Sequence, residues 1–93
     1  KYRSIHDLEF QLAEASRHDM PERAIPIYIK YAKQLINYRG RDNYQQAADL
    51  LSVVQHMYDQ LDEYETWEEL IENIRTEFKQ LPALQDELDK ARL

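Results

Sequence analysis

The sequence predicts an all-α fold, an antiparallel array of four long helices followed by a short C-terminal helix. Apolar residues recur at three- and four-residue steps from Ile5 to Leu88, which is the spacing of amphipathic helices. The 93 residues include one glycine and three prolines, too few for the tight turns of a β protein. Short predicted loops make consecutive helices antiparallel neighbours.

The first predicted helix begins at Ser4, whose hydroxyl can cap it, and ends within residues 17–19. One face of this helix carries the residues that are expected to reach the core, namely Ile5, Leu8, Leu12 and Ala15. Phe10 falls off this stripe, so it marks either a second packing surface or an exposed aromatic. An exposed Phe10 would support a weak homodimer through this helix.

If the second predicted helix starts at Pro21, Pro26 should kink it because proline lacks a backbone donor; otherwise the regular helix starts nearer Arg23. Gly40 lies where a left-handed C-cap is expected. The predicted core stripe of this helix is Ile25, Tyr28, Ile29, Ala32, Leu35 and Ile36.

The third predicted helix opens with Asp42 or Asn43 as its N-cap, and Gln45 can complete a capping box on Asp42. The small pair Ala47 and Ala48 should mark the closest approach of another helix. The whole predicted stripe is Tyr44, Ala47, Ala48, Leu51, Val54, Tyr58 and Leu61.

A break at residues 62–63 precedes the fourth predicted helix, whose start has two candidate capping boxes, Asp62 with Glu65 and Thr66 with Glu69. Pro82 ends this helix and can open a fifth. The residues expected to face the core are Trp67, Leu70, Ile71, Ile74, Phe78 and Leu81 in the fourth helix, and Leu84, Leu88 and Ala91 in the fifth.

Helix hairpins with a small residue four positions before a large one, as in Ala24 with Tyr28 and Ala47 with Leu51, resemble tetratricopeptide-type repeats. Four segments are also similar to the helical region downstream of the zinc finger in bacterial SWIM zinc-finger proteins: residues 19–28, residues 44–51, Trp67 with Ile71 and Ile74, and residues 81–88. This resemblance implies a helical accessory domain for protein–protein contact. The finger itself is not implied, because its ligands include cysteines and the chain has none.

The amino-acid composition excludes several kinds of covalent, metal and catalytic site. Without cysteine there is no disulfide, thiolate zinc site or thiol catalysis. No apolar run approaches membrane-spanning length and no signal peptide opens the chain, so a cytoplasmic location and no membrane contact are expected. Residues 1–93 are expected to be one helical domain from a longer protein, since the sequence begins with Lys1.

Charge is unevenly distributed along the chain. Residues 1–41 carry eight Lys and Arg against five Asp and Glu, whereas residues 42–74 carry nine acidic residues and no Lys or Arg. The acidic segment is interpreted either as a solvated helix face or as a docking face for a basic partner. A contiguous basic stripe would instead favour nucleic-acid binding through Arg23, Lys30, Lys33, Arg39 and Arg41.

Candidate chemical sites are few. His56 and Asp59 share one helix face, but two ligands fall short of the four of a structural zinc site, so no metal and no cofactor are expected. Carboxylates that could act as an acid–base pair stand on a helix flank where they should be ionised, so no enzyme activity is expected; they are Glu65, Glu68, Glu69 and Glu72. The basic turn at residues 39–41 precedes an acidic helix, which disfavours DNA binding there.

Five residues are candidates for contact with a partner protein. Tyr31 and Tyr38 lie off the core line of the second helix with Lys30 and Lys33 nearby, a composition common at interfaces, and Phe10 is the fifth. Packing against the third helix would explain the two tyrosines equally well. The expected function is therefore a non-catalytic interaction or scaffold domain, with an accessory nucleic-acid-binding domain or a structural spacer as alternatives.

Overall fold

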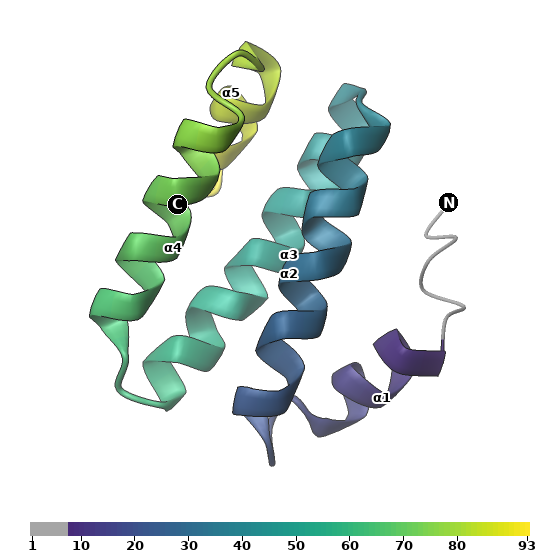
Figure 1. Ribbon diagram of the computed structural model, residues 1–93, viewed down its shortest axis with the longest axis vertical. Coiled ribbons are helices and arrows are strands. Elements are labelled where there is room, and N and C mark those ends of the chain that lie inside the picture. The colour runs from purple at the N-terminus through teal and green to yellow at the C-terminus, as the bar shows by residue number, and fades with distance from the viewer. Residues whose placement is uncertain (1–7) are drawn as a thin grey trace.

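The computed structural model describes residues 8–93 and contains five helices. They are α1 (Leu8–Ser16), α2 (Pro21–Tyr38), α3 (Arg41–Gln60), α4 (Tyr64–Glu77) and α5 (Pro82–Lys90) (Figure 1). No strand occurs in this part of the chain, so the predicted all-α class is confirmed. Helices α2, α3 and α4 run antiparallel in turn. The predicted start at Ser4 and the predicted core residue Ile5 lie outside the described residues.

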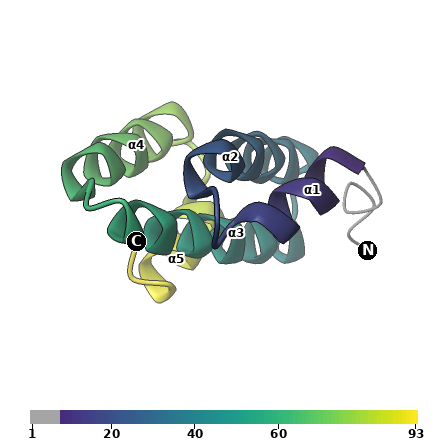
Figure 2. The same cartoon turned by 90° about the horizontal axis from the view of Figure 1, so that it is seen from below.

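Helix α3 is the centre of the arrangement. Helices α2, α4 and α5 each pack on α3, and α1 packs on α2. Seen from below, α2 and α4 form one layer, and α3 and α5 form a second layer that lies beneath it in the view (Figure 2). Helix α4 packs mainly on α3 and makes little contact with α2, although α2 and α4 lie in the same layer. A surface depression between the start of α2 and the start of α4 is described below.

Helices α2 and α3 have the most extensive contact of any helix pair in the described chain, and buried alanines line both of them. Ala24 and Ala32 of α2 and Ala47 of α3 are fully buried, and Ala48 is 2% exposed, so the two backbones approach closely, as the Ala47–Ala48 pair predicted. Most of the predicted stripes are buried. In the second to fifth predicted helices the exceptions are half-buried, namely Ile29, Tyr58, Leu61, Leu70, Phe78, Leu81 and Ala91.

The predicted core face of α1 was wrong. Leu8 and Leu12 are 68% and 60% exposed and Ala15 is also exposed, whereas Phe10 and Ala13 are each 2% exposed. The reason is a tertiary contact that the helical period does not reveal. The Phe10 ring packs against the Tyr28 and Tyr31 rings of α2, and these aromatic contacts turn the Phe10 face of α1 toward α2.

Helix termini also depart from the predicted caps. Gly40, with φ of 99°, is the N-cap of α3 instead of a left-handed C-cap of α2, and Arg39 at φ 67° ends α2. Because α3 begins at Arg41, Asp42 already lies in its first turn, where its charge favours the helix dipole without a side-chain cap bond. Asn43 does not cap α3: its Nδ2 donates to the Arg39 carbonyl at 2.7 Å.

The predicted capping boxes at α4 were wrong as well. Glu63 is the N-cap and makes no side-chain cap bond, while Asp62 adopts a left-handed conformation at φ 59° that reverses the chain. Thr66 lies inside α4 and is exposed. Pro82 is confirmed as the first residue of α5, and α2 continues through Pro26.

Ion pairs fix α5 against its neighbours. Arg41, at the first position of α3, donates to Asp86 at 2.9 Å and to Glu87 at 2.8 Å. Arg75 of α4 donates to Asp89 at 2.9 Å, and Gln85 Nε2 donates to the Phe78 carbonyl at 3.1 Å. Leu84 and Leu88 of α5 are fully buried beneath these contacts.

Candidate protein-interaction surface

The five residues predicted to contact a partner separate into two groups. Tyr38 is 69% exposed, and the side chains of Lys30 and Lys33 are partly exposed. Phe10 and Tyr31 are each 2% exposed, so the prediction that they present aromatic surface to a partner was wrong.

The burial of these two rings has a common cause. Phe10 lies between Tyr28 and Tyr31, with ring centroids 5.2 Å and 5.1 Å away, the second pair being edge-to-face. The three rings tie α1 to α2, and the Lys30 ammonium stands 5.2 Å from the Tyr31 ring centroid. A homodimer through an exposed Phe10 is therefore not available, because Phe10 is used inside the domain.

The possible basic stripe is interrupted by carboxylates from other helices. Lys30 pairs with Glu9 of α1, and Lys33 pairs with Glu77 of α4 at 3.3 Å. Arg41 pairs with Asp86 and Glu87 of α5. Three of the five stripe cations therefore already have anionic partners, and only Arg23 and Arg39 have no ion pair with a described residue.

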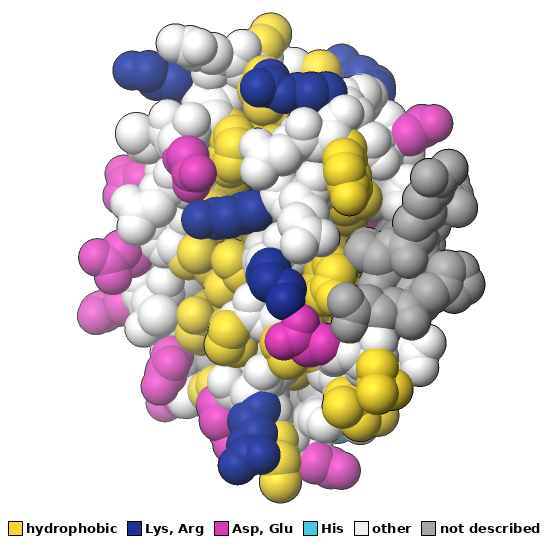
Figure 3. Space-filling view, turned by 45° about the vertical axis from the view of Figure 1, so that its right-hand side comes forward, with side chains coloured by type: hydrophobic (Ala, Val, Ile, Leu, Met, Phe, Trp, Pro, Cys, Tyr) yellow, Lys and Arg dark blue, Asp and Glu magenta, His cyan; other side chains and the backbone are white. Residues whose placement is uncertain are grey.

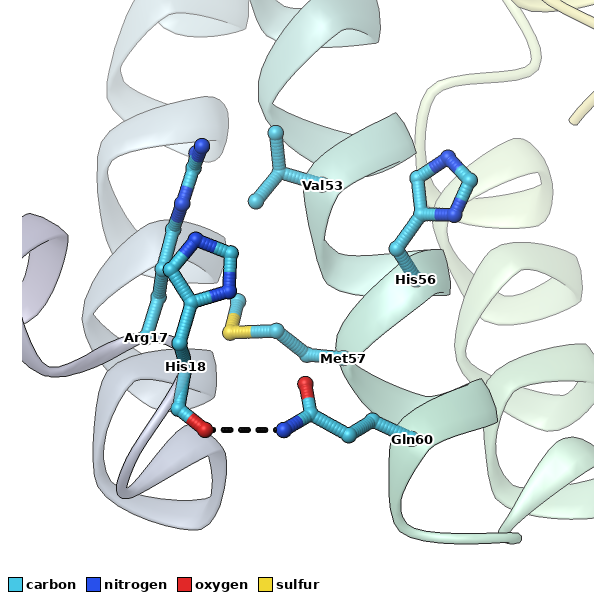
Figure 4. A pocket seen from close by; sticks show the side chains of 6 residues that line it. All are labelled: Arg17, His18, Val53, His56, Met57 and Gln60. Carbon is cyan, nitrogen blue, oxygen red and sulfur yellow. Dashed lines mark hydrogen bonds between the residues drawn. The ribbon is translucent and has the colours of Figure 1, made fainter.

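One apolar pocket lies where the turn after α1 meets the second half of α3. Its volume is about 200 Å³, and Figure 4 shows its lining residues: Arg17, His18, Val53, His56, Met57 and Gln60. Gln60 Nε2 donates to the His18 carbonyl at 2.8 Å, which joins the turn to α3. The two imidazole rings lie on opposite sides of the pocket.

This pocket does not assemble a metal or catalytic centre. Within residues 8–93, no cluster of three or more histidines and carboxylates is arranged to hold a metal ion. His56, the residue considered with Asp59 as a metal ligand, is exposed. The pocket offers a small apolar surface bordered by Arg17 and two histidines.

The carboxylates of α4 stand in solvent. The four carboxylates that are acid–base candidates in the sequence are all exposed, namely Glu65, Glu68, Glu69 and Glu72. The Tyr64 hydroxyl donates to Glu68 at 2.7 Å, and this hydrogen bond raises the pKa of Tyr64. Acid–base catalysis by a carboxyl pair needs one member shielded from water, and this helix flank does not shield any of them.

Hydrophobic side chains are exposed on the face formed by α2 and α4 (Figure 3), and we call this face the trough. Figure 3 shows hydrophobic side chains exposed on this face, with acidic side chains along the left edge and basic ones nearer the middle. The trough ends in a cavity of about 190 Å³ between the start of α2, the end of α3 and the start of α4. Its lining is Glu22, Ile25, Pro26, Tyr58, Leu61, Glu63 and Thr66. We call this end the acidic end of the trough.

Farther along the two helices, the Lys33–Glu77 pair bridges α2 and α4 and marks the other end of the trough. Ile29 and Leu70 lie between the two ends in the sequence of these helices and are half-buried. At the acidic end, burial raises the pKa of Tyr58, and the nearby Glu63 carboxylate raises it further. Glu63 and Tyr58 both line the cavity at this end.

Sequence reasoning missed both surfaces. The trough joins residues from positions 22–26 and 58–66, whose proximity depends on how α2 and α4 lie on α3. The one available signal was the acidic segment that begins at Asp42. A docking face for a basic partner is one interpretation of that segment, but the sequence does not show which of its residues form the face.

Comparison with known proteins gives little further information. No family model matches the sequence, and no solved structure matches it. The chain is similar to an uncharacterized protein of Bacillus subtilis strain 168, YwqB, with 29% identity over 90 residues. The aligned region is 97% of this chain and 17% of YwqB. The resemblances to tetratricopeptide repeats and to SWIM zinc-finger proteins stay predictions.

None of the helices within residues 8–93 combines the length and the apolar character needed to cross a membrane.

Proposed function

We propose that this chain is a non-catalytic protein–protein interaction or scaffold domain that works within a larger protein. The observation that carries the proposal is the trough between α2 and α4, where apolar side chains remain accessible beside charged ones. Exposed apolar surface that is bordered by polar residues is typical of interaction sites. The alignment with only 17% of a longer relative supports a role as one module among several.

The resemblance to the helical region of SWIM zinc-finger proteins supports the same proposal, because that region is a helical accessory domain. The nucleic-acid-binding alternative is weaker. A basic surface must be free to displace counterions from phosphates, and here Lys30, Lys33 and Arg41 already pair with carboxylates. The spacer alternative gives no reason for apolar side chains to remain accessible in a trough.

Site-specific photo-crosslinking tests the proposal. The full-length parent protein would carry benzoylphenylalanine at Thr66, which lines the trough, or at Thr76, which is exposed on α4 and does not line it. We expect a discrete crosslinked protein from Thr66 in the native cells and much less of it from Thr76. The partner is then identified by mass spectrometry and its binding is repeated with purified components.

Fluorescence anisotropy with labelled duplex DNA and single-stranded RNA tests the alternative. Binding of either at physiological ionic strength with micromolar affinity would favour the nucleic-acid function. Failure of purified candidate partners to bind, with no crosslink from any exposed position, would favour the spacer.

A further inference from the structure

We propose that the acidic end of the trough binds a positively charged amphipathic segment of a partner protein. In this arrangement one apolar side chain of the segment enters the cavity, and flanking Lys or Arg side chains reach Glu22 and Glu63. The inference rests on the proposed function and specifies the class of partner. It follows from the shape of the cavity and from the charges around it.

The floor of the cavity is apolar and the opening is accessible. Four apolar or aromatic residues line it: Ile25 is 5% exposed, Tyr58 and Leu61 are half-buried, and Pro26 is exposed. The cavity of about 190 Å³ lies between three helices, so an inserted side chain would contact α2, α3 and α4 together. Such a site gains affinity mainly by removing apolar surface from water.

Two carboxylates stand on different walls of this cavity. Glu22 belongs to α2 and Glu63 to the turn before α4, both are exposed, and neither forms an ion pair with a residue that the structure describes. No Lys, Arg or His lines the cavity. Arg23 follows Glu22 in the sequence but is not among the lining residues.

The surrounding sequence has the same sign. Residues 42–74 carry nine acidic residues and no Lys or Arg, and the whole chain has a formal net charge of −6. A basic segment would be attracted to this end of the molecule before contact, while an acidic one would be repelled. Lys33, farther along α2, is already paired with Glu77.

Two other surfaces specify an occupant less well. The pocket beside His18 carries Arg17 at its edge, yet its neighbours in sequence include the exposed acids Asp19 and Asp59, so its charge favours no class of partner. The exposed leucines of α1, Leu8 and Leu12, adjoin residues 1–7, which lie outside the described part of the chain. The acidic end of the trough is the surface whose shape and charge agree.

The experiment uses a fluorescein-labelled helical peptide of leucine and lysine, with leucine at three- and four-residue steps, and a companion with glutamate in place of lysine. Anisotropy is measured with the full chain at an ionic strength of about 0.15 M. We expect the lysine peptide to bind and the glutamate peptide not to bind. Binding of both peptides equally, or of neither, would overturn the proposal.

Matched variants locate the site. Thr66→Lys places a cation in the cavity, whereas Thr76→Lys makes the same change of charge on the same helix outside it. We expect Thr66→Lys to weaken lysine-peptide binding by about tenfold or more, and Thr76→Lys by less than about twofold. Both positions are exposed, so circular dichroism should show that both variants fold.

Equal weakening by the two variants would show general attraction to an acidic protein and would refute a site in the trough. The proposed function can still be judged independently of this inference. A partner crosslinked from another exposed position would keep the interaction function while the basic-segment inference fails, and loss of every crosslinked partner would remove both.

Discussion

Replacing Phe10 by alanine tests the packing of α1 most directly. The Phe10 side chain is 2% exposed and lies between the Tyr28 and Tyr31 rings. Truncation of a buried phenylalanine removes its transfer free energy and leaves a cavity, which together cost about 3–5 kcal/mol. Leu12→Ala is the matched control on the same helix: Leu12 is 60% exposed, so the free energy of unfolding should change by less than about 0.5 kcal/mol.

The expected loss is large relative to the stability of a small domain, about 5–15 kcal/mol in total. It also falls on one helix. Phe10 and Ala13 are the buried residues of α1, so without the phenyl ring α1 keeps little apolar contact with α2. Phe10→Ala should therefore either lower the stability of the whole domain or release α1 before the other helices unfold.

Urea unfolding followed by two probes separates these outcomes. Far-UV circular dichroism reports all helices, and the fluorescence of Trp67, the only tryptophan, reports the α3–α4 region where its ring is 3% exposed. Release of α1 would give early loss of ellipticity while the Trp67 transition keeps its midpoint. Cooperative unfolding would lower both midpoints. If Phe10→Ala matches the wild type by both probes, or Leu12→Ala is equally destabilised, the described packing of α1 is wrong.

Other predictions follow from the core, the absence of a ligand cluster and the ion pairs of α5. Leu51→Ala should lower the free energy of unfolding by about 2–5 kcal/mol and Ala48→Leu by about 1–3 kcal/mol, the first through a cavity and the second through overpacking, and parent-like urea midpoints would contradict burial of this face. Calorimetric titration with zinc should show no tight one-to-one site; such a site would redirect attention to His56. The hydrogen bond from Arg41 lowers the pKa of Asp86 below its ordinary value of 3.8. The Arg41–Asp86 pair therefore stabilises the fold above pH 3.8. This stabilisation is lost as the pH falls through the lower pKa of Asp86 in the folded chain. The difference in urea midpoint between the wild type and Arg41→Gln should therefore shrink below pH 3.8, and a difference that is constant down to pH 2 would contradict this role.

Long helices with a single apolar stripe were the predictable part of the fold. In α2 and α3 the three- and four-residue spacing selects one face, and Pro21 and Pro82 mark helix starts because proline costs nothing at a position whose donor is unused. In α1 the sequence offers two faces, one with Leu8 and Leu12 and one with Phe10. The apolar spacing predicted burial of the leucine face, whereas packing against Tyr28 and Tyr31 of α2 buries the Phe10 face instead.

Contacts between distant residues could not be read from the sequence. Lys30 and Glu9 are 21 positions apart, and Arg41 and Asp86 are 45 apart. The possible basic stripe through Lys30 and Arg41 was proposed from the sequence without these carboxylate partners. The cavity at the acidic end of the trough combines α2 with α4 and therefore depends on both crossing angles with α3, which local patterns do not specify.

The central position of α3 has a consequence for the order in which the chain folds. Most helix pairs that pack together are consecutive in the sequence. The main exception is the α3–α5 pair, which forms only when the intervening segment, residues 61–81 with α4, brings its two ends together. Predominantly local contacts favour folding in microseconds to milliseconds, with the α2–α3 hairpin formed early and α5 docked late. Because Arg41 meets Asp86 and Glu87 only when α5 docks, replacing Arg41 should accelerate unfolding and leave the folding rate almost unchanged.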